Sequence, residues 1–160
     1  MIKLSTNHGD ILIELDAEKA PETCENFERY VRDGHFDGTL FHRVINGFMI
    51  QGGGMSANFT EKPTREPIRN EAKNGLKNRK GTIAMARTME PHSASSQFFI
   101  NVADNAFLDH GTRDFGYAVF GRVISGQDIV DRIAGVPTTT VGPMQNVPQN
   151  AVVITSARRK

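Results

Sequence analysis

Short apolar runs bounded by turn residues recur along the chain, and they never alternate regularly with helical patterns. Apolar and polar side chains alternate over residues 2–4 and 11–15, around turn residues at 7–10, which predicts a β-hairpin. Similar runs follow at 40–45, 48–51, 82–86, 97–102, 117–123 and 151–157. About seven or eight strands without strand–helix alternation favour an antiparallel sheet closed into a barrel or a sandwich over a doubly wound fold.

Two segments show helical spacing instead. Pro21 suits the first turn of a helix that Gly34 ends, and its apolar side chains lie three to four residues apart at Cys24, Phe27, Tyr30 and Val31. A second helix is predicted from Ser125 to Gly135. Between Gly52 and Lys80 the sequence is polar and has no clear period, which predicts a long surface excursion.

The composition predicts one soluble domain spanning residues 1–160. A chain of 160 residues buries enough apolar surface to need neither disulfides nor a structural metal. Its single thiol, Cys24, suits a reducing compartment, and the N-terminus does not resemble a signal peptide, so we expect a cytoplasmic protein. A net charge of +1 gives no overall attraction to nucleic acid or to a membrane, and no apolar run is long enough to cross one.

Several motifs suggest chemistry but lack the context that it requires. Residues 52–57 fit a loose dinucleotide-binding pattern, yet Pro63 and Pro67 follow where that pattern needs a helix. The histidines are dispersed without metal-ligand spacing, and the serines at 93–96 have no nucleophile elbow. The basic stretch 73–80 has no interleaved aromatic residues, which favours a solvated loop over a nucleic-acid surface. We therefore expect no cofactor and no metal.

Residues 41–53, FHRVINGFMIQGG, closely resemble the signature of the cyclophilin family of peptidyl-prolyl cis-trans isomerases. Residues 95–100 resemble that family's second marked block, and 85–88, 107–109 and 119–121 fall where the family has equivalents. The resemblance covers essentially the whole chain and is strongest to the small bacterial cytosolic members. It implies a mainly β fold, an eight-stranded antiparallel closed β-barrel capped by two α-helices.

The implied reaction is rotation about the peptide bond that precedes proline, which has a barrier of ~18–20 kcal/mol. A catalyst can hold the proline ring in an apolar pocket and offer a hydrogen-bond donor to the imide nitrogen as it becomes pyramidal. We expect Arg43 to be that donor, because its guanidinium is always charged and carries several N–H groups in a fixed fork. Lowering the barrier by ~7 kcal/mol would accelerate rotation about 10⁵-fold.

The resemblance implies the other site residues. Gln51 joins Arg43 as a catalytic residue and, with Gln97, orients it, while the proline pocket consists of Phe48, Met49, Phe99 and Leu108 with Phe107 beside it. The backbone of Ala86 and Arg87 would bind the substrate as an added strand, and Thr88 and Tyr117 complete the substrate-binding set.

The chain departs from the common family pattern at four positions. Phe107 replaces a common tryptophan, Arg87 replaces an asparagine, Tyr117 replaces a histidine and Asn46 replaces a proline. The loss of an indole N–H at Phe107 predicts weakened affinity for cyclosporin-type cyclic peptides. Tyr117 is expected to alter the pocket rim and hence sequence preference.

The expected partners are proline-containing peptides and unfolded or folding proteins, bound by a monomer. A proline-peptide binding module or holdase with incidental turnover remains the alternative, since it would use the same pocket. The presence of both Arg43 and Gln51 favours the enzyme. A nucleic-acid partner at the 62–80 loop is a third possibility, which would show binding that weakens steeply with salt.

Overall fold

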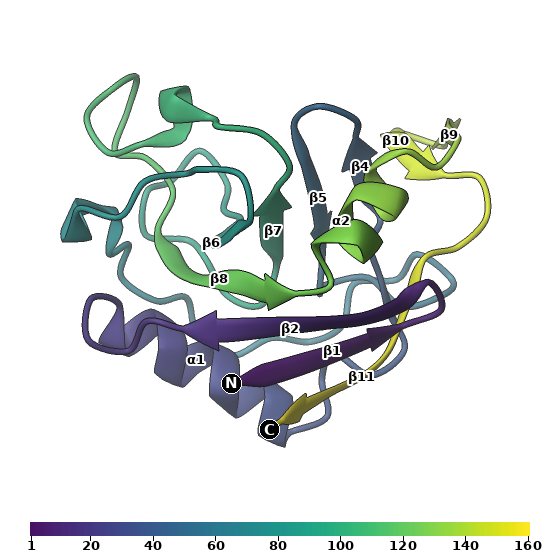
Figure 1. Cartoon of the computed structure of the whole chain (residues 1–160), viewed down its shortest axis with the longest axis horizontal. Coiled ribbons are helices and arrows are strands. Elements are labelled where there is room, and N and C mark those ends of the chain that lie inside the picture. The colour runs from purple at the N-terminus through teal and green to yellow at the C-terminus, as the bar shows by residue number, and fades with distance from the viewer.

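A single antiparallel sheet that returns on itself dominates the computed structural model, which describes residues 1–160 (Figure 1). Its strands are β1 Ile2–Thr6, β2 Gly9–Leu15, β3 Thr39–Leu40, β4 Arg43–Ile45, β5 Met49–Gly52, β6 Thr82–Met85, β7 Phe98–Asn101, β8 Val119–Ser125 and β11 Val153–Arg159. A separate hairpin contains β9 Thr138–Val141 and β10 Met144–Pro148. The helices are α1 Pro21–Arg32, α2 Gln127–Ala134 and the short 3₁₀ turns η1 Ala72–Asn74 and η2 Ala106–Leu108.

The strand order is β3-β11-β1-β2-β8-β6-β7-β5-β4, and its two ends are consecutive in the chain. Only Phe41 and His42 separate β3 from β4, so they are two halves of one interrupted strand. The first half pairs with β11 and the second with β5. Counted in this way the ring has eight strand positions, which confirms the predicted antiparallel barrel with two helices.

Both helices bury their apolar sides in one core. Pro21 occupies the first turn of α1, and Phe27 and Tyr30 project from that helix into the same cluster as Val130 and Ile133 of α2. Figure 1 shows α1 beneath β1 and β2, and α2 beside β4 and β5. Cys24 is buried in this core, and burial raises the pKa of its thiol to about 12. Neither helix is long and apolar enough to cross a membrane.

The register of β4, β5 and β7 places the predicted site. Arg43 lies opposite Gln51, and Gln51 lies opposite Phe99. Directly opposed residues of neighbouring strands present their side chains on the same face. The three side chains therefore share one face of the sheet, although they come from separate segments of the sequence.

The structure differs from the sequence-based prediction in two segments. The β9–β10 hairpin was not predicted, and it turns at Gly142, whose φ is 57°. The 52–80 segment is less open than a surface excursion, since it contains η1 and the buried residues Asn70, Ala72 and Asn78. The side-chain hydrogen bonds of Asn70 and Asn78 hold this segment against the barrel in place of regular secondary structure.

Candidate active site

A hollow of about 440 Å³ opens beside β4, β5 and η2. We call it the apolar hollow, and its lining residues are Arg43, Phe48, Met49, Gln51, Ala86, Arg87, Phe99, Phe107, Leu108, Arg113 and Tyr117. All the predicted site residues except Thr88 and Gln97 are among them. Arg113 was not predicted, because nothing in the sequence marks an arginine in a loop as part of a pocket.

The floor of the apolar hollow is a small hydrophobic cluster separate from the main core. Met49, Phe99 and Leu108 are buried in it, together with Ala84 and Val119. Phe48 and Phe107 stack at the mouth with ring centroids 5.6 Å apart, and Phe107 remains 41% exposed. This arrangement offers a fixed apolar surface of the size and chemistry that a proline ring can fill.

Arg43 belongs to a series of hydrogen-bonded side chains along the edge of the hollow. Its Nη1 donates to Oε1 of Gln51 at 3.3 Å, and Nε2 of Gln51 donates to Oε1 of Gln97 at 3.0 Å. Gln97 in turn lies tightly against the backbone of Gly54, where an added Cβ would be only 2.5 Å from the Gln97 Cγ. The series orients the guanidinium while leaving other N–H groups free to donate.

Arg87 uses its side chain to join two segments of the site. Its Nε donates to the carbonyl of Gly116 at 3.1 Å and its Nη1 to the carbonyl of Thr88 at 2.9 Å. The guanidinium carbon lies 4.4 Å from the centre of the Tyr117 ring, and the side chain is only 3% exposed. The sequence suggested only a backbone role for Arg87, because this stacking depends on a loop folded from distant residues.

A network of hydrogen-bonded asparagine side chains lies next to the hollow. Nδ2 of Asn105 donates to the carbonyl of Phe48 at 2.9 Å and to Oδ1 of Asn101 at 2.8 Å. Asn101 donates to Asn78, whose backbone N–H and side chain both donate to Asp109. The network therefore connects the turn before β5 with the residue that follows η2, and it fixes the two aromatic walls relative to each other.

Thr88 and Gln97 line a smaller adjacent hollow of about 220 Å³. It shares Gln51, Ala86 and Arg87 with the apolar hollow. The strand β6 has ended before Ala86, whose N–H donates to Gln97 at 3.0 Å. The segment 86–88 thus runs between the two hollows.

His42, which precedes Arg43, carries no positive charge at neutral pH. Burial, and after it the charge of Arg43, lowers the pKa of the imidazole below its usual 6.5. Its Nδ1 is buried without a hydrogen-bond partner. The positive charge at this edge of the hollow therefore comes from arginine alone.

The lining of the apolar hollow contains no Ser, Thr, Cys, His, Asp or Glu side chain. It therefore offers neither a carboxylate–imidazole pair nor an activated nucleophile. What it does offer is an apolar seat with guanidinium donors at its edge. That combination can bind a ring and stabilise developing electron density on a neighbouring atom without covalent chemistry.

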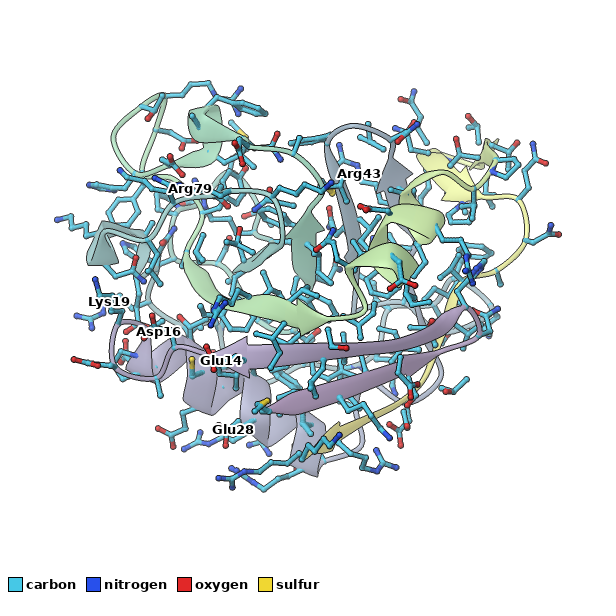
Figure 2. All side chains as sticks on the ribbon, viewed as in Figure 1. Glu14, Asp16, Lys19, Glu28, Arg43 and Arg79 are labelled. Carbon is cyan, nitrogen blue, oxygen red and sulfur yellow. The ribbon has the colours of Figure 1, made fainter.

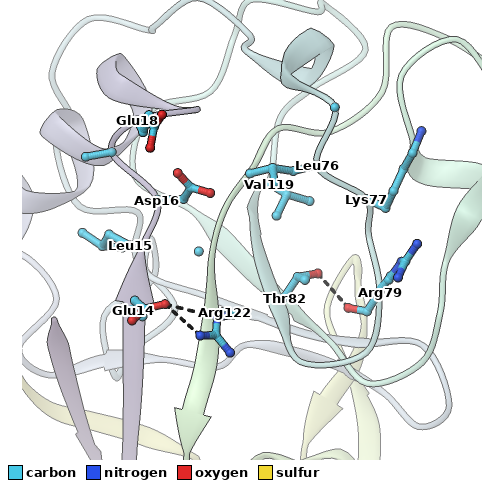
Figure 3. A pocket seen from close by; sticks show the side chains of 13 residues that line it. Glu14, Leu15, Asp16, Glu18, Leu76, Lys77, Arg79, Thr82, Val119 and Arg122 are labelled. Atoms are coloured by element: carbon cyan, nitrogen blue, oxygen red, sulfur yellow. Dashed lines mark hydrogen bonds and ion pairs between the residues drawn. The ribbon is translucent and has the colours of Figure 1, made fainter.

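A larger hollow, of about 660 Å³, lies elsewhere and contains none of the predicted site residues (Figure 3). Glu14, Asp16 and Glu18 line it together with the basic Lys77 and Arg79. Figure 3 also shows the hydrogen bonds from Arg122 to Glu14. The shorter one joins Nη2 of Arg122 to Oε1 of Glu14 at 3.0 Å. These carboxylates lie in the same hollow as part of the basic stretch, so that stretch does not form a uniformly positive face that would favour nucleic acid.

Comparison with known proteins gives a consistent result. The family described as "Cyclophilin type peptidyl-prolyl cis-trans isomerase/CLD" matches residues 1–159. The chain is 58% identical to peptidyl-prolyl cis-trans isomerase A of Dickeya dadantii (strain 3937) over 157 residues, which is 98% of this chain and 83% of the relative. It is 55% identical to peptidyl-prolyl cis-trans isomerase B of Escherichia coli (strain K12) over 159 residues, which is 98% of this chain and 97% of the relative.

The fold is also similar to a solved structure. A cyclophilin-type isomerase of Cryptosporidium parvum, crystallised in the presence of the dipeptide Ala-Pro, matches with a TM-score of 0.81 at 27% identity. The match covers 98% of this chain and 96% of the solved one.

Proposed function

The chain belongs to the cyclophilin-type peptidyl-prolyl cis-trans isomerases, and from this premise we propose that Arg43 supplies the catalytic hydrogen bond while the apolar hollow holds the proline ring. The protein is a peptidyl-prolyl cis-trans isomerase, and its substrates are proline-containing peptides. The observation that carries the residue assignment is the position of Arg43. It lines the same hollow as Phe99 and is oriented by Gln51.

The proposed mechanism needs no bond to carbon to form or break. In either planar isomer the nitrogen lone pair is delocalised into the carbonyl, and the nitrogen is a poor acceptor. In the twisted state the lone pair is localised on nitrogen, and a guanidinium N–H of Arg43 donates to it. Because this bond is stronger in the twisted state than in either isomer, it lowers the barrier rather than merely tightening binding.

The remaining site residues position the peptide. Met49, Phe99 and Leu108 contact the ring from below, while Phe48 and Phe107 flank it. The backbone of Ala86 and Arg87 binds the substrate chain beyond the end of β6, with Thr88 and Gln97 bordering the adjacent hollow. Main-chain pairing of this kind reads few side chains, which suits unfolded and folding proteins as substrates.

The substitution Arg43→Ala tests the assignment. Cis–trans exchange of a short Ala-Pro peptide, followed by NMR without a coupled protease, is expected to slow at least ~100-fold, as for loss of one transition-state donor. Peptide affinity is expected to stay within about tenfold, since the apolar hollow is intact. The exposed Arg122→Ala, on β8, provides a matched control that removes the same charge.

Unchanged exchange in the Arg43 variant would show that the mechanism is wrong. Peptide binding without accelerated exchange by the unaltered protein would instead favour the binding-module alternative.

We propose weakened binding of cyclosporin-type cyclic peptides, because Phe107 lacks the indole N–H that tryptophan offers. Phe107→Trp is expected to strengthen that binding with little change in peptide exchange, and calorimetry of the two proteins measures it. Equal affinities would remove the proposal.

We also propose that residues 1–160 act as one domain and as a monomer in the cytoplasm. The single, buried thiol of Cys24 supports a reducing compartment. Light scattering on the purified chain tests whether it is a monomer, and a stable dimer would contradict this. Fractionation of cells tests the compartment, and an enrichment outside the cytoplasm would contradict that proposal.

A further inference from the structure

Three arginines surround the apolar hollow, and no carboxylate is among its lining residues. Arg43 comes from β4, Arg87 from the segment after β6, and Arg113 from the loop after η2. The catalytic proposal uses only the first of them. The positive charges of Arg87 and Arg113 have no role in that proposal.

Nearby carboxylates neutralise only part of this charge. Asp114 lies 3.4 Å from Nη2 of Arg87 and is itself 45% exposed, whereas neither Arg43 nor Arg113 has an acidic oxygen within 4.0 Å. Glu61 lines the adjacent hollow rather than this one. His42 is neutral because burial and the charge of Arg43 lower its pKa. The mouth of the apolar hollow therefore keeps a net positive charge, although the whole chain carries only +1.

The three arginines differ in burial, since Arg43 and Arg113 are exposed and Arg87 is not. Arg87 is almost fully buried, and its Nη2 has no hydrogen-bond partner within the chain. Arg113 lies over the Phe107 ring, 5.3 Å from its centre, at the open side of the hollow. Buried charges are screened by salt and water much less than exposed ones. Figure 2 shows Arg43 in the upper part of the molecule, with Glu14, Asp16 and Glu28 below it around β2 and α1.

We propose that the isomerase acts preferentially on prolyl bonds in which a residue adjacent to the proline is anionic. This inference rests on the proposed function, because it places the proline ring in the apolar hollow and the neighbouring side chain at its mouth. An acidic side chain at that position gains from Arg43 and Arg113, which have no acidic partner, and from the net positive charge of the mouth, and a basic one is repelled. The preference is electrostatic, so it affects productive binding more than the chemistry of rotation.

The test compares isosteric peptides that differ only in charge. One series places Glu, Gln or Lys before the proline, a second places them after it, and exchange is measured by NMR in ~20 mM salt, where the Debye length is about 20 Å. The expected kcat/KM for Glu exceeds that for Lys by about tenfold in at least one series, with Gln between them. A ratio of threefold or more in either series supports the proposal, and a smaller ratio in both, or a preference for Lys, overturns it.

Two further measurements assign the preference to these arginines. The Glu-to-Lys ratio is expected to fall to about a third of its value in Arg113→Gln but to persist in Arg122→Gln, which removes an equal charge from the exposed pair with Glu14. It is also expected to shrink toward unity in ~0.5 M salt. A ratio unaffected by Arg113→Gln or by salt would overturn the electrostatic origin.

The Gln peptide separates the two proposals. If the unaltered protein fails to accelerate its exchange, the proposed function is wrong. If it accelerates the Gln, Glu and Lys peptides equally, only the charge preference is wrong.

Discussion

The Arg87 guanidinium stacks on the Tyr117 ring with its carbon 4.4 Å from the ring centre, and the same ring meets Phe99 edge-on with centroids 5.7 Å apart. Phe99 is part of the hydrophobic floor of the apolar hollow. A side chain that follows β6 therefore braces the wall of the hollow through a loop almost thirty residues later in the chain. Such stacking contributes more when, as here, the cation is desolvated.

Replacing Arg87 with Met is expected to loosen this wall. The variant keeps an apolar stem but loses the stack and the bonds to Gly116 and Thr88, so we expect KM for a short prolyl peptide to rise several-fold with kcat little changed. The chain has only two tyrosines, so NMR of ring-labelled tyrosine reports on Tyr117 directly, with Tyr30 in the core as internal control. Unshifted Tyr117 signals would contradict the bracing role, and Arg87→Lys separates charge from stacking.

Gly54→Ala is expected to impair activity, although Gly54 itself does not line the apolar hollow. Gly54 does not need a positive φ, but its added methyl would lie 2.5 Å from Cγ and 2.6 Å from Nε2 of Gln97. Displacing Gln97 breaks its bond to Gln51 and frees Arg43, so we expect exchange to slow about tenfold. Gly135→Ala, whose methyl would meet nothing closer than 3.7 Å, is the matched control.

A double-mutant cycle checks this route. In a Gln97→Ala background, Gly54→Ala is expected to slow exchange no further, because both changes act through the same side chain. Fully additive losses would point to a different cause.

Asn105→Ala is expected to destabilise the fold. It leaves the buried Oδ1 of Asn101 without its donor, and an unsatisfied buried group costs about 1–3 kcal/mol. The carbonyl of Phe48 loses one donor but still accepts from the backbone N–H of Val102. Urea unfolding measures the difference in free energy. Asn150→Ala, at an exposed position, is expected to change it by less than ~0.5 kcal/mol, and equal effects of the two variants would show that the network contributes nothing.

Stability is expected to decrease between about pH 6.5 and pH 5. Burial lowers the folded-state pKa of His35 and of His42 below 6.5, so the unfolded chain binds more protons in this window. Their contribution is complete above pH 6.5 and is lost as the pH falls toward the lowered values. Asp37, whose pKa is lowered from 3.8 chiefly by Arg158, acts only in a more acidic window.

Urea unfolding at a series of pH values tests this expectation. The slope between pH 6.5 and pH 5 is expected to decrease in His42→Gln and in His35→Gln. A slope that stays the same in both variants would assign it to other groups.

The sequence predicts much of the fold because local signals agree with tertiary packing. The turn at Asn46–Gly47 defines the β4–β5 hairpin, and that hairpin places Arg43 opposite Gln51. Pro21 and the apolar spacing of α1 likewise define a helix whose buried face packs as predicted. Where the sequence pattern and the tertiary packing agree in this way, periodicity alone is enough to predict the secondary structure element and its buried face.

Other features depend on contacts between distant segments and leave no local signal. The Arg87 stack needs Tyr117, and Arg113 reaches the hollow only because its loop folds over Phe107. In the sequence, Asn101 resembles an ordinary amide at the end of a strand and Asn105 an ordinary loop amide. Both are nevertheless buried, and their side chains are hydrogen-bonded to each other. The β9–β10 hairpin has mostly half-exposed and exposed residues, so it lacks the apolar runs that marked the other strands.

The interrupted strand formed by β3 and β4 has a consequence for how the principal sheet meets other polypeptides. Extended polypeptides associate readily with any free row of backbone N–H and C=O groups, and such rows seed aggregates. Here the two ends of the strand order are short, β3 with two residues and β4 with three, and they follow each other in the chain. Such short end strands give another extended chain few backbone groups to pair with, so the ends of the sheet are poor templates for aggregation.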